Sequence, residues 1–194
     1  MKIHDMAALS KLEIMPYEKY MVKDATLDGG DVLNTGRHIF VGLSPRTNDN
    51  GVNCLKLAFE PKDEEDDYGK TLPVIPIEVY KDLHLKSVVT HVDGYNLIIM
   101  DNESGSHIIS KIRERCGDGH KYRFFRTKDH AAVNVVRIND KLFVAKGCKD
   151  DEAIKRACAS AKIDMKNVIE IDNSEEAKAD GLITCKCLLI TQSK

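Results

Sequence analysis

The sequence repeats a strand–strand–helix–strand unit about every 45 residues, and this periodicity limits the fold more than any other feature. Residues 31–42, 87–99 and 133–145 each contain two short apolar runs around a turn, and residues 182–190 form a fourth, shorter segment of this kind. The first three turns carry residues that tolerate positive φ. These residues are Thr35-Gly36, Asp93-Gly94 and Asn139-Asp140.

Each of the first three strand pairs is followed by a helical pattern and then by another apolar run. The sequence predicts helices over residues 49–59, 104–116 and 150–161, and strands over 72–79, 122–125 and 168–171. Ser104 and Asp150 are the predicted N-caps of the second and third helices. Ile108, Ile109 and Ile112 share one helical face, which predicts that this face is buried.

The two ends of the chain fit the same frame. We expect a helix near residues 5–12 and a strand near residues 20–23, and the final pair at 182–190 would complete a fourth unit with them. Repeats that close on themselves are typical of a propeller. The alternative is an ordinary open α/β sheet.

Charge and hydropathy narrow the classes of protein. The net charge of −2 indicates no polyanion partner, and the acidic run Lys62-Asp-Glu-Glu-Asp-Asp67 is typical of a solvated loop. No apolar run reaches the ~20 residues of a membrane span, and the first residues lack the hydrophobic core of a signal peptide. A cytoplasmic location is expected. In that reducing compartment the six cysteines are predicted to be free thiols, most of them buried.

Three sets of phrases are similar to signature segments of one enzyme family. They are Ala25-Thr-Leu-Asp-Gly-Gly-Asp-Val32 with Gly42-Leu-Ser-Pro-Arg-Thr-Asn48, then Leu83-His-Leu-Lys-Ser87, then Asp180-Gly-Leu-Ile-Thr-Cys185. In this order they resemble the dimethylarginine dimethylaminohydrolases, from about residue 7 to the C-terminus. The resemblance implies an α/β fold, an incomplete five-bladed α/β propeller, with residues 1–194 as a single domain whose N-terminal blade is absent.

The resemblance also implies a reaction. Cys185 would attack the guanidinium carbon of dimethylarginine or monomethylarginine, and a covalent thiouronium intermediate would yield citrulline and the methylated amine. His84 would be the general acid and base, since imidazole titrates near neutral pH. No cofactor is implied. Without the resemblance, Cys185 would be interpreted as a core thiol on the last strand, and His84 as a surface side chain.

Four further residues complete the implied site. Asp28 would orient the imidazole of His84, although it could instead cap a turn, and Asp31 is the other candidate for the orienting role. Arg46 would hold the substrate carboxylate, the alternative being a solvated turn residue. Ala179 and Asp180 would lie beside the substrate, which in the family is received by a backbone carbonyl at the position of Ala179.

No metal is required by this reaction, but a zinc ion could inhibit it. Cys185, Cys187 and His84 together could supply three ligands. Packing is the favoured interpretation of Cys187, with helper and redox roles as alternatives. The sequence shows no dinucleotide or phosphate loop, and no basic strip with interleaved aromatic residues for RNA.

The beginning of the chain departs from the family pattern. In the family, about one blade precedes the stretch aligned with Met1, and it carries the acidic residues that grip the guanidinium. A second departure is an insertion around residues 60–69. We therefore expect poor turnover, and self-association through an uncovered edge of the ring. A largely inactive binding or regulatory protein and a partial gene prediction are the alternatives to an active hydrolase.

Overall fold

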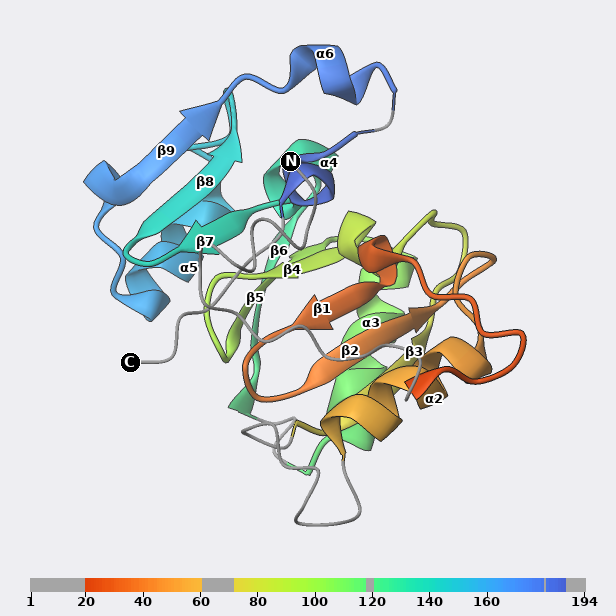
Figure 1. The fold of residues 1–194 in the computed structure, drawn as a ribbon. Helices are drawn as coiled ribbons and strands as arrows, with labels where there is room; N and C mark the ends of the chain where they lie inside the picture. Colours follow the sequence, from red (N-terminus) through yellow and green to blue (C-terminus); the bar gives the residue numbers. More distant parts are fainter. Residues whose placement is uncertain (1–19, 61–71, 118–120, 180, 188–194) are drawn as a thin grey trace, which may run out of the picture.

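The computed structural model describes residues 20–60, 72–117, 121–179 and 181–187 (Figure 1). They form three separate three-stranded sheets, in the orders β1-β2-β3, β4-β5-β6 and β7-β8-β9. In every sheet the first two strands are antiparallel and the last two parallel. The strands are β1 Val32–Asn34, β2 Ile39–Leu43, β3 Val74–Glu78, β4 Val89–His91, β5 Asn96–Met100, β6 Arg123–Thr127, β7 Val136–Ile138, β8 Lys141–Ala145 and β9 Val168–Ile171.

One helix joins the two parallel strands of each sheet, so the predicted strand–strand–helix–strand unit is confirmed three times. The joining helices are α2 Asp49–Phe59, α3 Glu103–Arg115 and α5 Glu152–Ala161. Among the described residues, the short helix α4 His130–Val133 lies between the second and third units, and the short helix α6 Ser174–Ala177 follows the third unit. Four 3₁₀ turns are also described. The turns are η2 Gly29–Asp31, η4 Leu85–Ser87, η6 Met165–Asn167 and η7 Ile183–Lys186.

The helices pack the blades against each other. Helix α3 of the second blade contacts β3 of the first, and α5 of the third contacts β5 and β6 of the second. Ile108, Ile109 and Ile112 are buried at 1%, 7% and 0% exposure, as the helical spacing predicted. The fold is therefore an α/β propeller whose described part has three blades and is not a closed ring, and the predicted fold class is confirmed.

Side-chain caps fix where the helices begin. Asn48, Asn102 and Asp151 each accept a hydrogen bond from a backbone N–H in the first turn of the helix that follows. The predicted caps Ser104 and Asp150 are therefore wrong by one or two positions. Ser104 already lies inside the first turn of α3, and the cap of α5 is Asp151 rather than Asp150.

Two of the three predicted hairpin turns use positive φ. Gly36 has φ of 75° and Asn139 has φ of 56°. At the middle turn neither Asp93 nor Gly94 adopts positive φ. There the glycine serves close packing, because a Cβ at position 94 would lie 3.0 Å from Nε of Arg37.

Predictions at the ends of the chain were less successful. The helix near 5–12 and residues 61–69 of the acidic insertion lie outside the described residues. Residues 20–23 are not a strand, and Asp24, with φ of 58°, follows them in a turn. The predicted strand at 182–190 is also wrong where it can be seen, because residues 183–186 form the 3₁₀ turn η7.

Within the described ranges, none of the helices has the length and apolar character needed to cross a lipid bilayer.

Candidate active site

Asp28 lies at the entrance to the 3₁₀ turn η2, where two backbone contacts fix it. Its Oδ1 accepts a hydrogen bond of 2.8 Å from Gly30 N–H, and its own N–H donates to Oγ1 of Thr47 over 2.9 Å. Asp28 is thus a turn cap, as one of the two interpretations of the sequence held. The cap uses Oδ1 only, so the second carboxylate oxygen remains to face the site.

His84 packs against this turn. Its Nε2 lies 3.3 Å from Oδ2 of Asp28, although the ring is not aligned to form a hydrogen bond with that oxygen. The absence of a side chain at Gly30 allows the approach, because a Cβ there would lie 2.6 Å from Cγ of the imidazole. The side chain of His84 is only 13% exposed. A protonated ring would therefore face a carboxylate at close range with little water to screen the pair.

Asp31 has a different environment, although it is only three residues from Asp28. It is fully buried, and Oδ2 accepts hydrogen bonds of 2.7 Å from Ser44 and 2.8 Å from Thr47. Its Oδ1 accepts a third, of 2.9 Å, from the backbone N–H of Leu85. Asp31 thus holds the residue that follows His84, while Asp28 faces the imidazole itself.

Arg46 reaches the same carboxylate from the turn after β2. Its Nη1 lies 3.5 Å from Oδ2 of Asp28, and the side chain is 55% exposed. The pKa of Asp28 lies below its ordinary value, first because of the bond from Gly30 N–H; burial opposes this, and His84 and Arg46 lower the pKa further. Asp28 is therefore ionised at neutral pH between two groups that favour its anionic form.

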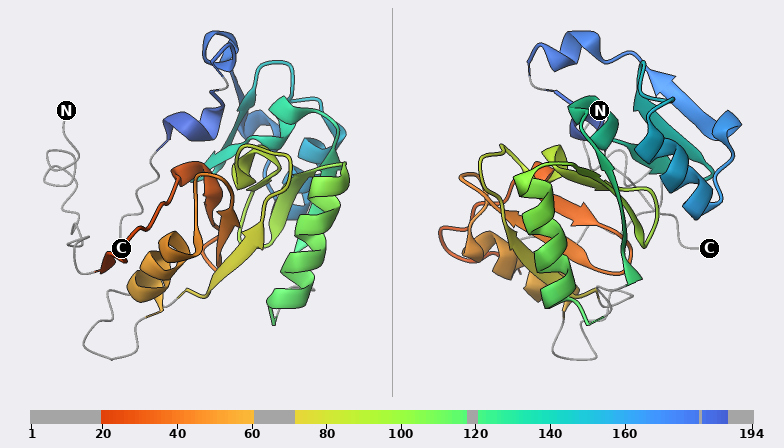
Figure 2. Two further views of the ribbon diagram at one scale, coloured as in Figure 1. Left: turned by 90° about the vertical axis from the view of Figure 1, so that its right-hand side faces the viewer. Right: turned by 180° about the vertical axis from the view of Figure 1, so that it is seen from behind.

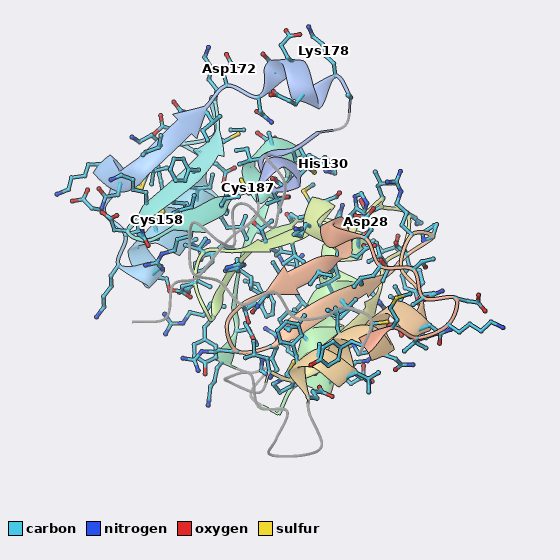
Figure 3. The ribbon with its side chains drawn as sticks, in the orientation of Figure 1. Asp28, His130, Cys158, Asp172, Lys178 and Cys187 are labelled. Carbon is cyan, nitrogen blue, oxygen red and sulfur yellow. The ribbon has the colours of Figure 1, made fainter. Side chains whose placement is uncertain are left out.

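The segment of Cys185 lies next to these groups. Turn η7 packs against η2, as the dark blue and orange-red turns in Figure 2 (left) show. Cys185 is the exposed member of the six free cysteines, while Cys187 is half-buried and its Sγ donates to the carbonyl of Ile183 over 3.3 Å. Figure 3 labels Asp28 and Cys187, which come from the two facing segments. The exposure of Cys185 contradicts the interpretation as a core thiol on a strand.

Lys86 is a charged neighbour that sequence reasoning missed. Burial lowers the pKa of its ammonium group, while its proximity to Cys185, Asp28 and Cys187 acts in the opposite direction. Lys86 thus lies within electrostatic range of both the turn of Cys185 and the carboxylate that faces His84. The sequence shows that Lys86 lies two residues after His84, but it does not show that the side chain is buried near Cys185 and Asp28.

A cavity of about 190 Å³ lies beside Lys86 between the first strands of the three blades. Its wall includes Thr90, His91 and Arg137 on the blades, and Thr184 and Cys187 on the η7 side. Burial lowers the pKa of His91 to about 4, and Lys86 and Arg137 lower it as well, while Asp93 opposes them. His91 is therefore neutral at physiological pH.

The remaining predicted positions are less well defined. Ala179 is exposed just after α6, and its N–H donates to the carbonyl of Glu176. Asp180 lies outside the described residues. Across the part of the chain that the structure describes, no three His, Cys, Asp or Glu side chains are placed to hold a metal ion, so Cys185, Cys187 and His84 do not form the zinc site considered above.

Comparison with known proteins places the chain in a family. A family model described as RNA-editing substrate-binding complex 5 protein matches residues 17–146, about two thirds of the chain. The chain belongs to this family. The match includes Asp28, Arg46 and His84 and ends before Cys185. The segment of Cys185 therefore lies outside the matched residues.

Enzymes are also among the relatives. A dimethylarginine dimethylaminohydrolase of Streptomyces coelicolor is 49% identical over 100 residues, covering 43% of this chain and 36% of that enzyme. The Pseudomonas aeruginosa enzyme is 27% identical over 164 residues, covering 84% of this chain and 56% of that enzyme. A solved structure of the latter with citrulline has a TM-score of 0.61 at 21% identity, covering 83% and 55% of the two chains. The predicted resemblance is confirmed, and the chain spans about half or less of each of these enzymes.

Proposed function

We propose that this chain carries the catalytic side of a thiol-dependent amidine hydrolase that acts on methylated arginine. The observation that carries the proposal is the Asp28–His84 contact of 3.3 Å beside the turn of the exposed Cys185. A carboxylate, an imidazole and an accessible thiol are the three groups that such chemistry needs. The similarity to dimethylarginine dimethylaminohydrolases supports the choice of substrate.

In the proposed reaction the thiolate of Cys185 attacks the central guanidinium carbon and forms an S–C bond. His84 donates its proton to the leaving nitrogen as the C–N bond breaks, and dimethylamine departs from a thiouronium intermediate. The imidazole then accepts a proton from water, whose oxygen attacks the same carbon. The S–C bond breaks as the hydroxyl proton of the adduct passes to solvent and the C=O bond forms, citrulline is released, and the thiolate of Cys185 and the protonated imidazole are restored. Asp28 stabilises the imidazolium form in each half of the cycle.

Substrate contacts follow from the positions of the remaining groups. Arg46, on the exposed side of Asp28, is suited to the substrate carboxylate by its planar guanidinium. By resemblance to the family, we expect the carbonyl of Ala179 and the residue Asp180 to lie beside the substrate. Among the groups described at the site, Asp28 is the carboxylate next to His84, and it already interacts with His84 and Arg46. We therefore expect weak binding of the guanidinium by these residues alone, seen as a high KM and low turnover.

The family match favours a second candidate function. The description of that family as an RNA-editing substrate-binding complex protein favours a non-catalytic subunit that contacts RNA. A hollow of about 690 Å³ at the turn end of the second blade supports this, because Arg37, Lys121 and Arg123 line it. Tyr95 also lines it, with the Arg37 guanidinium 3.9 Å above its ring. Cations next to an aromatic ring are suited to phosphates and bases.

Citrulline release from dimethylarginine by the full chain tests the first function. We expect slow release that Cys185→Ser abolishes and Cys116→Ser leaves unchanged, since Cys116 is buried in the core. Equal loss in both variants, or equal retention, would remove the nucleophile assignment.

Anisotropy of a labelled single-stranded RNA tests the second function. If the hollow binds RNA, a double variant with Arg37→Ala and Arg123→Ala weakens binding, while Cys185→Ser does not. RNA binding that is absent in the wild-type chain, or that is unaffected by the double variant, contradicts the second candidate.

A further inference from the structure

Asn134 connects the two halves of the candidate site. It lies directly after α4 and is 2% exposed. Its Nδ2 donates to the carbonyl of Lys86 over 3.2 Å and to Oγ1 of Thr184 over 3.0 Å. Its Oδ1 accepts a bond of 2.9 Å from the backbone N–H of Thr184. One amide thus binds the residue before Cys185 and the residue two positions after His84.

The amide can bind in only one orientation. The N–H of Thr184 needs an acceptor, and the carbonyl of Lys86 needs a donor, so oxygen and nitrogen cannot exchange places. An aspartate has no donor for Lys86, and an apolar side chain has neither group. The contact therefore depends on asparagine itself rather than on the size of the side chain.

The backbone that carries Asn134 is itself held in place. Oγ1 of Thr90, on the first strand of the second blade, donates to the carbonyl of Val133 and accepts from Val135 N–H. These bonds lie on either side of Asn134 and are buried. A side chain on such a fixed base can hold a neighbouring segment in a defined position.

Asn134 supplies the hydrogen bonds that join turn η7 to its neighbours, beside the packing of Ile183 in the core. Cys185 N–H and Cys187 N–H donate only within the turn, to Leu182 and Thr184. Considering the described residues alone, the hydrogen bonds that join η7 to another element are those of Asn134. Without them, the turn would keep its internal bonds and lose its register against the loop of His84.

We propose that Asn134 is a positioning residue that sets Cys185 against His84, an inference that rests on the hydrolase function proposed above. It does not touch the substrate. It acts through Thr184 and through the backbone of Lys86, and both effects are lost together when the amide is removed. The cooperation between imidazole and thiol is the property that it controls.

The test measures that cooperation through alkylation of Cys185 in the full chain. Chloroacetamidine carries an amidinium group similar to the guanidinium, and the thiolate displaces its chloride to form a thioether. Trypsin cleaves after Lys178 and Lys186, so Cys185 and Cys187 fall on separate peptides, residues 179–186 and 187–194, which mass spectrometry can quantify. The rates form a double-mutant cycle over Asn134→Ala and His84→Ala.

We expect His84→Ala to slow labelling of Cys185 by about tenfold in the wild-type background and by less than about twofold in Asn134→Ala, a coupling typical of groups in one network. Asn134→Asp should behave like Asn134→Ala, because it cannot donate to Lys86. Asn96→Ala is the matched control: Asn96 is also buried, at 5% exposure, and binds Asp93 and Ser160 away from the site. It should leave the effect of His84→Ala unchanged.

Two outcomes would overturn the proposal, and they differ in what else they overturn. If His84→Ala slows labelling equally in both backgrounds, the positioning role fails and the hydrolase proposal stands. If His84→Ala has no effect even in the wild-type background, both fail. Thermal unfolding checks that each variant is folded. Should Asn134→Ala not fold, Thr184→Val replaces it in the cycle, since it removes the Oγ1 partner alone and should give a smaller coupling loss in the same direction.

Discussion

Replacing Asp31 with asparagine should destabilise the protein much more than the same replacement of Asp28. Both carboxylates lie at turn η2, three residues apart, and either could have been the one that serves His84. The structure gives them different surroundings: Asp31 is fully buried with three hydrogen-bond donors, and the side chain of Asp28 is 30% exposed. The two substitutions remove the same charge, so their difference reports the environment.

The magnitude follows from the bonds that each change removes. A hydrogen bond to a charged group contributes about 1.5–3 kcal/mol, roughly twice a neutral one. In the Asp31→Asn variant the new amide could still accept from Leu85 N–H, but its NH₂ group would face the hydroxyls of Ser44 and Thr47, which now donate and would have to turn. We expect a loss of about 2–4 kcal/mol. At position 28 an asparagine keeps the bond from Gly30 N–H and loses the charge that faces the largely exposed Arg46, for about 1 kcal/mol or less.

Urea unfolding at pH 7, followed by circular dichroism, measures both free energies of unfolding. A parallel measurement of Cys185 alkylation by chloroacetamidine should show the reverse order, with Asp28→Asn affecting the rate and the folded fraction of Asp31→Asn reacting normally. If Asp28→Asn destabilises the protein as much as Asp31→Asn does, the separation of a structural carboxylate from an orienting one is wrong.

Two further changes probe the same region. Because folding lowers the pKa of His91 to about 4, the unfolded state binds this proton first as the pH falls, so the free energy of unfolding should fall by up to about 3 kcal/mol between pH ~6.5 and ~4. His91→Gln should flatten that part of the urea-unfolding profile, and an unchanged slope would mean that another group titrates there. Gly30→Ala should displace the His84 ring, destabilise the protein by about 1–3 kcal/mol and slow citrulline release, because its Cβ would lie 2.6 Å from Cγ of His84. Gly29→Ala, whose Cβ would meet nothing within 4 Å, is the control, and equal effects of the two would contradict the contact.

The sequence was sufficient for the repeating unit because hydrophobic period and turn residues are local signals. The predicted helix at 49–59 and the predicted strand at 168–171 have the observed bounds of α2 and β9. The strand predicted at 182–190 is wrong because its structure depends on a contact that is distant in the sequence. An apolar run favours a strand, but a strand needs a partner for its hydrogen bonds, and Thr184 instead forms its contact with Asn134, which is 50 positions earlier in the chain.

At the site, too, short local phrases identified residues, but roles that depend on distant segments could not be predicted. Cys185, His84 and Asp28 were identified through a family resemblance that rests on short phrases. Periodicity alone would not have selected them. The roles of Asp28 and Asp31 could not be separated from the sequence, because the groups that distinguish them, at positions 44, 47 and 85, come from later segments. Asn134 and Lys86 were missed because their partners come from other segments of the chain. Asn134 binds Thr184, and Lys86 lies near Cys185 and Asp28.

The contact between Asp28 and His84 bears on the choice between catalysis and binding. Nε2 of His84 is buried without an aligned hydrogen bond, and such a group usually costs about 1–3 kcal/mol of stability. The carboxylate beside it offsets part of this cost, and it offsets more when the ring is protonated. Turn η2 does not need the pair, because Asp31 already holds Leu85 and the cap of Asp28 uses the other oxygen. A scaffold that only bound a partner would be more stable with an apolar side chain in place of His84. An imidazole that faces a carboxylate is the arrangement that the proposed hydrolase needs, and a His84→Leu variant that is more stable than the wild-type chain but no longer releases citrulline would agree with this reasoning.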